Sequence, residues 1–157
     1  MNPELDLSVE RIIRAPRKVV WEAWTDPSRL AQWWIPTPMT CRVERLEVCP
    51  GGAFVTQMSD DGLTFVPHLD ACFLLVEEFE RIVFTNAVDS QWRPASPDPI
   101  AMTAEVRLYD HADGTDYRIV ARHGDQAART RHAELGFADG WGTVTDQLAR
   151  FAQASSR

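Results

Sequence analysis

Two short helical segments follow one another between residues 15 and 34, and this stretch holds four of the chain's six tryptophans. Pro16 and Pro27 each open a segment, where a helix tolerates proline because the missing N–H would have no partner in the first turn. In the second segment Leu30 and Trp34 are four residues apart, which gives that helix an apolar stripe. Two short aromatic helices ahead of a long strand-forming region are an unusual order, so this stretch constrains the fold far more than the reaction.

The rest of the chain, up to about residue 123, alternates between apolar and polar residues as β-strands do. One strand precedes the helices; its alternation begins at Leu5, and it ends at residues 14–16. Further strands are predicted over residues 41–48, 53–58, 63–66, 69–76, 81–88, 100–108 and 117–123. The segments 63–66 and 69–76 are either two strands or one strand broken near Pro67. An antiparallel sheet of six or seven strands is expected. The alternation of apolar and polar residues shifts by one position at residues 44–45, which indicates a β-bulge.

From Asp125 onward, the apolar residues recur at the spacing of a helix. Apolar side chains at spacings of four, three, four and three form one stripe of a long amphipathic helix: Phe137, Trp141, Val144, Leu148 and Phe151. Glycines at positions 136, 140 and 142 interrupt it, which indicates either a bend or a backbone that lies close to a partner surface. This stripe is the one available to cover the apolar face of the sheet. Residues 1–157 are expected to form a single α+β domain, since no repeat or linker divides them.

Charge and targeting signals narrow the class of protein. The net charge of −7 disfavours nucleic acid and anionic membrane as partners, because both require a basic surface. The three cysteines form no CxxC pair and indicate free thiols in a reducing compartment. The first residues lack the basic and apolar regions of a signal peptide, and no apolar run approaches the ~20 residues of a membrane span. A cytoplasmic location is expected.

Several motifs, taken in order, resemble those of one protein superfamily. They lie at residues 15–27, 30–34, 50–52, 80–85 and 136–141. Together they resemble the START-like or helix-grip (SRPBCC) superfamily, in particular the polyketide-cyclase-like group related to the C-terminal domain of the heat-shock-90 ATPase activator. The resemblance covers residues 5 to 152.

The resemblance implies a helix-grip fold, in which a curved antiparallel sheet wraps around a long C-terminal helix. It also implies a cavity between sheet and helix that takes a small apolar or amphipathic molecule. Homodimers are common in such proteins. Members of the superfamily differ widely in activity, so the fold does not fix the function.

Candidate ligand-binding residues are aromatic, histidine or methionine side chains that are expected to face this cavity. They are Trp33, Trp34, Phe65, His68, Phe73, Trp92, Met102, Tyr117, His123, Phe137 and Trp141. The alternative for the aromatic members is ordinary core packing. Trp21 and Trp24 are expected in the core. Trp92 lies on a proline-rich loop and is either a lid over the cavity or a surface anchor.

The histidines allow three kinds of chemistry. His123 is in phase with Tyr117 and is expected to face the covered side of the sheet, as a polar group for a ligand, a general acid or base, or a hydrogen-bonded strand end. His68 stands two residues before Asp70, but a metal site needs a third ligand and no metal motif is present, so no metal is expected. His132 is nine residues before Trp141 and is expected to face solvent on an ideal helix, unless the helix bends at residue 136.

Motifs for covalent catalysis and nucleotide binding are absent from the sequence. There is no GxSxG, GxGxxG or Walker pattern, and Cys72 lies in an apolar strand where a thiol is inert. No cofactor is expected, and the sequence leaves open whether the protein is an enzyme. The leading hypothesis is binding of a small hydrophobic or aromatic ligand. The alternatives are a cyclase or hydratase that uses acid–base chemistry in the same cavity, and an interaction module like the chaperone ATPase activator.

Overall fold

A computed structural model describes residues 1–156 of the chain. It contains one seven-stranded antiparallel sheet in the order β1-β7-β6-β5-β4-β3-β2, and four helices. The strands are β1 (Asp6–Ile13), β2 (Thr40–Leu46), β3 (Ala53–Ser59), β4 (Val66–Glu77), β5 (Arg81–Thr85), β6 (Thr103–His111) and β7 (Gly114–Arg122). The helices are α1 (Arg17–Thr25), α2 (Pro27–Leu30), α3 (Gln126–Glu134) and α4 (Phe137–Ser155).

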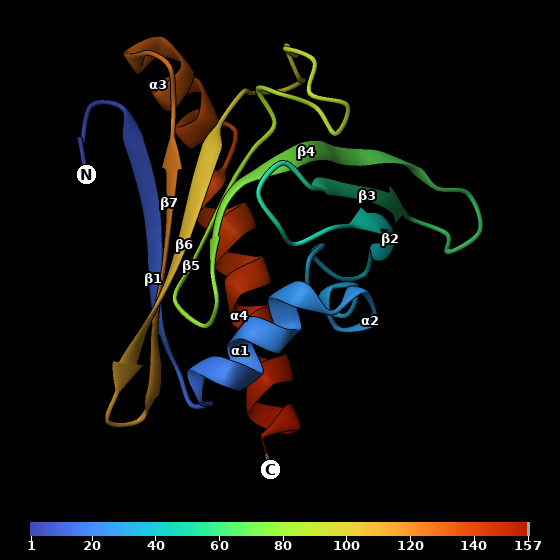
Figure 1. Ribbon diagram of the computed structural model, residues 1–157. Coiled ribbons are helices and arrows are strands. Elements are labelled where there is room, and N and C mark those ends of the chain that lie inside the picture. The colour runs from blue at the N-terminus through green and yellow to red at the C-terminus, as the bar shows by residue number, and fades with distance from the viewer. Residues whose placement is uncertain (157) are drawn as a thin grey trace.

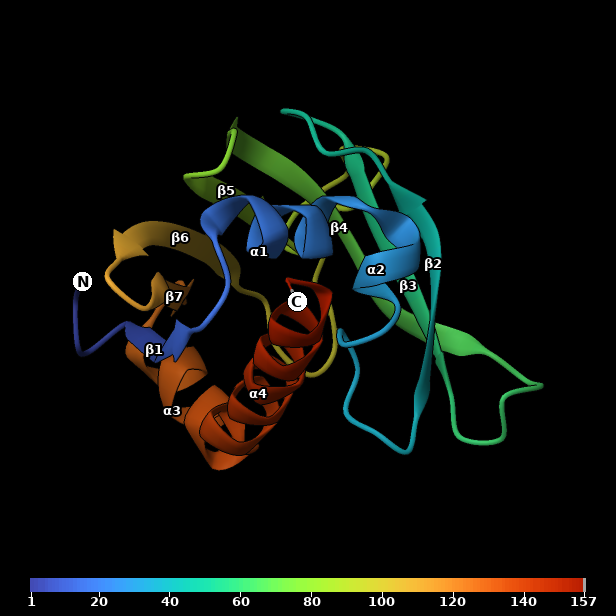
Figure 2. The same cartoon turned by 90° about the horizontal axis from the view of Figure 1, so that it is seen from below.

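The sheet curves around the C-terminal helix. Figure 1 shows α4 running along the inner side of the strands, and Figure 2 shows the strands as an arc with α4, α1 and α2 on its concave side. The expected helix-grip architecture, with two short helices after the first strand, is confirmed.

Local signals in the sequence account for the short helices and one of the bulges. The Asp26 carboxylate accepts hydrogen bonds from the backbone N–H groups of Ser28 and Arg29 and so caps α2. The predicted bulge at residues 44–45 is confirmed, because the register of β2 against β3 shifts between Val43 and Arg45.

The region around Pro67 is one continuous strand, β4, with a bulge of its own. Thr56 of β3 pairs with Leu69, whereas Gln57 pairs with Pro67, so His68 is the extra residue between them. A bulge bends a strand and redirects the side chain at that position. Of the two alternatives for residues 63–76, the structure therefore shows one strand, which begins at Val66 and not at residue 63.

The long helix predicted from Asp125 is in fact two helices. Gly136 has a φ of +92°, a left-handed conformation that ends the path of α3 and starts α4 in a new direction. Helix α3 has no buried residue, whereas α4 buries the predicted apolar stripe at Phe137, Val144 and Leu148.

An aromatic cluster fills the space between the helices and the sheet. Trp24 is 1% exposed, and its ring packs on those of Trp33, Trp34 and Phe54 with centroid distances of 5.1 to 6.4 Å. Its indole N–H donates to the Tyr117 hydroxyl over 3.2 Å. The expectation that Trp24 belongs to the core is confirmed, and the same holds for Trp21, which is 8% exposed.

One buried amide joins α4 to the segment that follows α2. The Gln147 Nε2 group donates to the carbonyl oxygens of Trp33 and Ile35, at 3.0 and 2.9 Å, and its Oε1 atom accepts from the N–H of Thr37 at 2.9 Å. Because these backbone groups have no strand or helix partner, Gln147 satisfies three groups that would otherwise be costly to bury.

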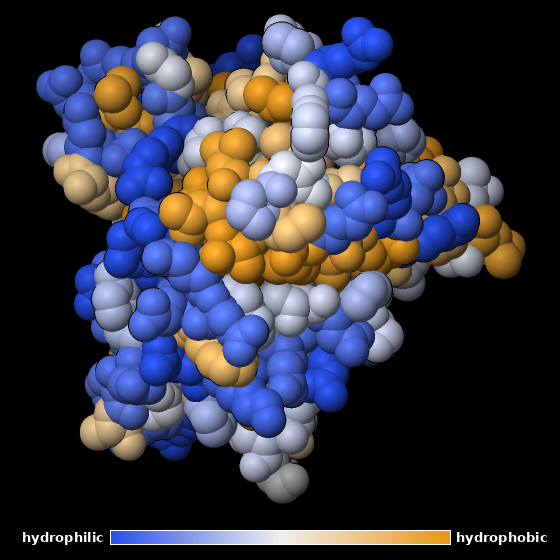
Figure 3. All heavy atoms as spheres, viewed as in Figure 1, coloured by the Kyte–Doolittle hydropathy of each residue, from blue (hydrophilic) through white to orange (hydrophobic). Residues whose placement is uncertain are grey.

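The surface is largely hydrophilic on the face shown in Figure 3, with a hydrophobic band across its middle, where β3, β4 and β5 lie in Figure 1. Leu74 of β4 is half exposed. Within residues 1–156, no helix has both the length and the apolar character to cross a membrane.

Replacing Gln147 by glutamate tests the role of its amide. Gln147→Glu keeps the shape of the side chain but removes the Nε2 donor, so two buried carbonyl oxygens lose their partner and we expect a loss of about 3 kcal/mol in unfolding free energy. Urea denaturation measures this loss. The matched control is Gln153→Glu on the same helix. The Gln153 side chain uses only its oxygen, which accepts from the Arg14 N–H and which glutamate keeps, so we expect the unfolding free energy to change by less than about 0.5 kcal/mol. Equal effects of the two substitutions would contradict the role assigned to Gln147.

Replacing Gly136 by alanine tests the break between α3 and α4. A Cβ atom there would meet no neighbouring atom within 4 Å, so the cost comes from the positive φ alone and should be about 2 kcal/mol. Gly124→Ala is the control, because that position also has open space but no positive φ, and its stability should stay within about 0.5 kcal/mol of the wild type. Thermal or urea unfolding of both variants checks the difference.

Candidate functional site

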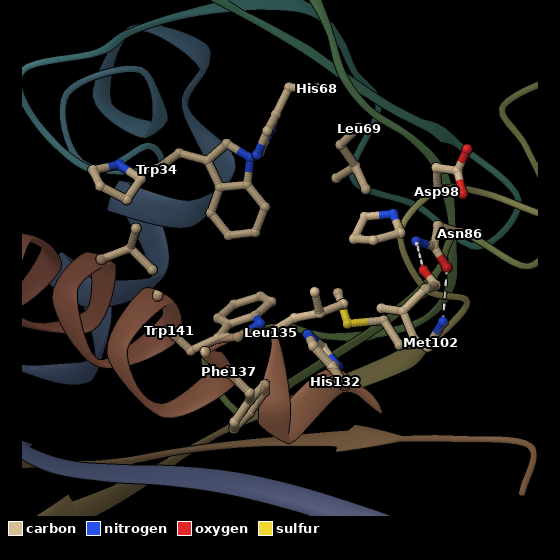
Figure 4. A pocket seen from close by; sticks show the side chains of 16 residues that line it. Trp34, His68, Leu69, Asn86, Asp98, Met102, His132, Leu135, Phe137 and Trp141 are labelled. Atoms are coloured by element: carbon tan, nitrogen blue, oxygen red, sulfur yellow. Dashed lines mark hydrogen bonds between the residues drawn. The ribbon is translucent and has the colours of Figure 1, made fainter. Parts of the chain in front are cut away.

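A pocket of about 440 Å³ opens between α4 and the concave side of the sheet. One wall is the face of α4 that carries Phe137, Gly140, Trp141 and Val144; His132 of α3 and Leu135, just after α3, extend this wall. The facing wall is formed by Trp34, Pro36, His68, Leu69, Asn86, Asp98, Pro99, Ile100 and Met102, with Gly136 between the helices. Figure 4 shows Trp34 and His68 on one side of this space and Trp141, Phe137 and His132 on the other.

The apolar part of the pocket is made of aromatic rings that touch one another. The Trp34 and Trp141 rings meet edge to face with centroids 5.5 Å apart, and Phe137 lies 6.2 Å from Trp141. Such contacts fix the positions of the rings, and the apolar wall that they form suits an apolar or aromatic molecule.

A hydrogen-bonded chain fixes Trp34 and His68 relative to each other. The Trp34 indole N–H donates to the Thr56 hydroxyl over 3.3 Å, and that hydroxyl lies 2.9 Å from His68 Nδ1. Thr56 is fully buried, and the bulge at His68 brings the imidazole to the pocket. His68 is exposed as a residue, but nearby protein atoms partly desolvate the charged form of its ring and so lower its pKa.

A second chain joins two histidines at the other end of the pocket. His123 Nδ1 lies 2.8 Å from the carbonyl oxygen of Leu5, and His123 Nε2 lies 2.8 Å from His132 Nδ1. His132 packs edge to face on Phe137, with 5.0 Å between the ring centroids. Burial, and then the like charge that His123 would carry, lower the pKa of His132 to about 4.

The loop that closes the pocket is tied to the sheet by an amide. Asn86 donates from Nδ2 to the carbonyl oxygen of Ile100 over 3.1 Å and accepts from the N–H of Met102 over 2.8 Å. A second hollow, of about 260 Å³, continues the first past Asp98 toward Asp70 and Asp89. Asp70 and Asp89 both accept hydrogen bonds from backbone N–H groups, so they hold the loop in place.

Five of the eleven predicted ligand-binding residues line this pocket: Trp34, His68, Met102, Phe137 and Trp141. Six do not: Trp33, Phe65, Phe73, Trp92, Tyr117 and His123. Trp33 and Tyr117 are each 1% exposed, and their polar atoms are used inside the core, on the Ala23 carbonyl and the Trp24 indole.

The other predicted residues outside the pocket lie in the core or at the surface. Phe73 is 1% exposed in the core. Phe65 lies beyond the end of β3 under the guanidinium of Arg42, 3.9 Å from the ring centroid. Trp92 is 70% exposed and donates to the carbonyl oxygen of Gly51 over 2.7 Å, which matches the surface anchor and not the lid.

His123 faces inward as the sequence predicts, whereas His132 does not lie where an ideal continuous helix would place it. His123 is 6% exposed and faces inward as expected, but it reaches the pocket only through His132. His132 was expected to face solvent unless the helix bends at residue 136. The chain does turn at Gly136, so the angle along an ideal helix no longer applies and His132 lines the pocket. The glycine at 136 is the sequence signal for this turn.

Cysteine chemistry has no place in the pocket. Burial raises the pKa of the Cys72 thiol, as expected for an inert side chain, and raises that of Cys41 to about 11. Within residues 1–156, no three histidine, cysteine or carboxylate side chains lie close enough together to hold a metal ion.

Comparison with known proteins identifies the family. The model of the family described as Activator of Hsp90 ATPase homolog 1-like protein matches residues 14–153. No curated protein matches the chain.

Solved structures similar to this chain agree with the family match. A protein of Nitrosomonas europaea is 36% identical, with a TM-score of 0.85 over 99% of this chain and 98% of that one. An Arthrobacter aurescens protein is 22% identical with a TM-score of 0.81, over 96% of this chain and 87% of that one. An AHSA1-like protein of Aeromonas hydrophila is 21% identical with a TM-score of 0.69, over 96% and 94%. The chain therefore belongs to the Activator of Hsp90 ATPase homolog 1-like family, within the START-like (SRPBCC) superfamily.

Proposed function

We propose that this protein binds a small apolar or aromatic molecule in the pocket between the sheet and α4. The observation that carries the proposal is the open space of about 440 Å³ bounded by the rings of Trp34, Phe137 and Trp141. Binding sites for small molecules have volumes of about 300–1,000 Å³ and mostly apolar walls with a few polar groups. Removing apolar surface from water contributes about 25 cal/mol per Å², so a ligand that covers these rings would be bound mainly by burial.

Acid–base catalysis in the same pocket is the second candidate function. It is favoured by His132, which borders the pocket and whose lowered pKa keeps the imidazole neutral at pH 7, so that a ring nitrogen can accept a proton, as a weak base. The role of a chaperone ATPase activator rests on the family description alone. A cytoplasmic location and homodimerisation stay predictions.

Filling the pocket from α4 tests the binding function. Gly140 lines the pocket, and a Cβ atom there would meet nothing within 4 Å, so Gly140→Leu places a side chain in the open space. Leucine also favours a helix over glycine by up to about 1 kcal/mol, so the fold should be kept or stabilised. We expect affinity for 2-naphthol to fall by at least about ten-fold, the equivalent of 1.4 kcal/mol.

NMR titration measures this affinity at the indole N–H signals of Trp34 and Trp141, with those of the core residues Trp24 and Trp33 as internal references. The control is Ala138→Leu, an exposed position of α4 that does not line the pocket and should leave the affinity unchanged. Saturable binding that perturbs Trp24 but neither Trp34 nor Trp141, or that survives Gly140→Leu, would place the site elsewhere and contradict the proposal.

A further inference from the structure

We propose that this pocket selects its ligand through two hydrogen bonds of opposite sense: His132 Nε2 accepts one from a ligand hydroxyl or N–H, and His68 Nε2–H donates one to a ligand carbonyl or ether oxygen. This inference rests on the proposed binding function and adds the chemical class of the ligand, an apolar or aromatic molecule with a donor and an acceptor. It follows from the partners of each imidazole, taken one nitrogen at a time.

The tautomer of His123 is fixed by its backbone partner. A carbonyl oxygen can only accept, so the nitrogen that lies 2.8 Å from the Leu5 oxygen, His123 Nδ1, must carry a hydrogen. Neutral His123 then has a lone pair on Nε2. The partner of that lone pair, His132 Nδ1 at 2.8 Å, must therefore be the donor. Neutral His132 is left with its own lone pair on Nε2.

A charged pair would break this sequence of donors and acceptors, but the surroundings disfavour it. His123 is 6% exposed, and within residues 1–156 no carboxylate lies within ion-pair distance of either ring. A buried charge without a counter-charge is costly, which favours an uncharged pair, and the low pKa of His132 agrees with a neutral His132 ring at pH 7. An added proton would rest either on His132, which would then carry a hydrogen on both nitrogens, or on His123, which would then donate from Nε2 to His132 Nδ1. In both cases His132 Nε2 would carry a hydrogen and would be a donor instead of an acceptor.

The free nitrogen of His132 is open to a ligand. Its ring is half-buried and lines the pocket, and Nε2 has no hydrogen-bond partner among the described residues. This nitrogen also reaches solvent. In residues 1–156 the one buried side-chain nitrogen or oxygen without a hydrogen-bond partner is Arg129 Nε, so the unpartnered His132 Nε2 is not buried.

The tautomer of His68 follows from Thr56 in the same way. The Thr56 hydroxyl is fully buried and contacts two nitrogens, the Trp34 indole N–H and His68 Nδ1. An indole N–H only donates, so the hydroxyl hydrogen has His68 Nδ1 as its acceptor. Neutral His68 then carries its hydrogen on Nε2, which bonds to no other described residue.

The two groups lie on opposite sides of an apolar space. Figure 4 shows His68 beside Trp34 on one wall and His132 beside Phe137 on the other. A buried donor or acceptor without a partner is penalised, so a purely apolar ligand would leave both imidazoles unsatisfied when it excluded water. A molecule with a hydroxyl toward His132 and a carbonyl toward His68 satisfies both.

The tautomers themselves can be measured without any ligand. Long-range ¹H–¹⁵N correlation spectra of ¹⁵N-histidine-labelled protein at pH 7 distinguish a protonated from an unprotonated ring nitrogen. We expect His132 to be protonated on Nδ1 alone and His68 on Nε2 alone. A hydrogen on His132 Nε2, or on His68 Nδ1, would overturn the proposal.

Two pairs of naphthalene probes test the contacts one at a time. For His132 the pair is 2-naphthol and 2-methoxynaphthalene, which differ in the donor; for His68 it is 2-acetylnaphthalene and 2-ethylnaphthalene, which differ in the acceptor. We expect the first member of each pair to bind about five-fold more tightly, as measured by NMR titration, because one net hydrogen bond is gained.

Reciprocal variants separate the two contacts. His132→Phe should abolish the preference for 2-naphthol and keep that for 2-acetylnaphthalene, while His68→Phe should do the reverse, so each variant is the other's control. If all four probes bind the wild-type protein equally, the inference fails and the binding function stands. If none of the four binds, the proposed function fails as well. If either variant is poorly folded, the tautomer spectra of the wild-type protein and its probe ratios still decide the outcome.

Discussion

The buried amide of Gln147 is the contact on which the pocket depends. Three backbone groups of residues 33–37 are held to α4 by this one side chain, and neither a helix nor a strand supplies them with another partner. Because that segment contains Trp34, the same amide sets how closely the indole approaches Trp141. Thr56 holds the opposite edge of the Trp34 ring. The aromatic wall is thus built by polar contacts behind it as much as by the packing of the rings.

The polar end of the pocket depends on the direction in which the chain leaves α3. In one continuous helix, His132 and Trp141 would point to opposite sides, since nine residues make two and a half turns. The left-handed conformation of Gly136 breaks the helix and places the His132 ring between Phe137 and His123. Since α3 buries no residue, the contact between the two histidines is one of the few that hold this helix to the rest of the molecule.

The fold was predictable from the sequence because its signals are local: alternation marks the strands, the apolar stripe marks α4, and a change in which residues are apolar marks the bulge after Val43. The site was predictable only in part. Trp33 and Trp34 are adjacent and both buried, and only their distant partners, Ala23 and Thr56, separate a core residue from a pocket residue. The pairing of the histidines needs a positive φ and a tertiary contact, and neither has a periodic signal in the chain.

The pocket has walls of two kinds. Trp34, Phe137 and Val144 belong to the hydrophobic core, and the chain cannot change them without a cost in stability. The loop around Asp98 and the open position at Gly140 line the same space but carry little of the core's packing. Such a division lets mutation reshape the loop side while the core side keeps the protein folded. Relatives that share this architecture at about 20% identity can thus differ on the loop side of this space and keep the same fold.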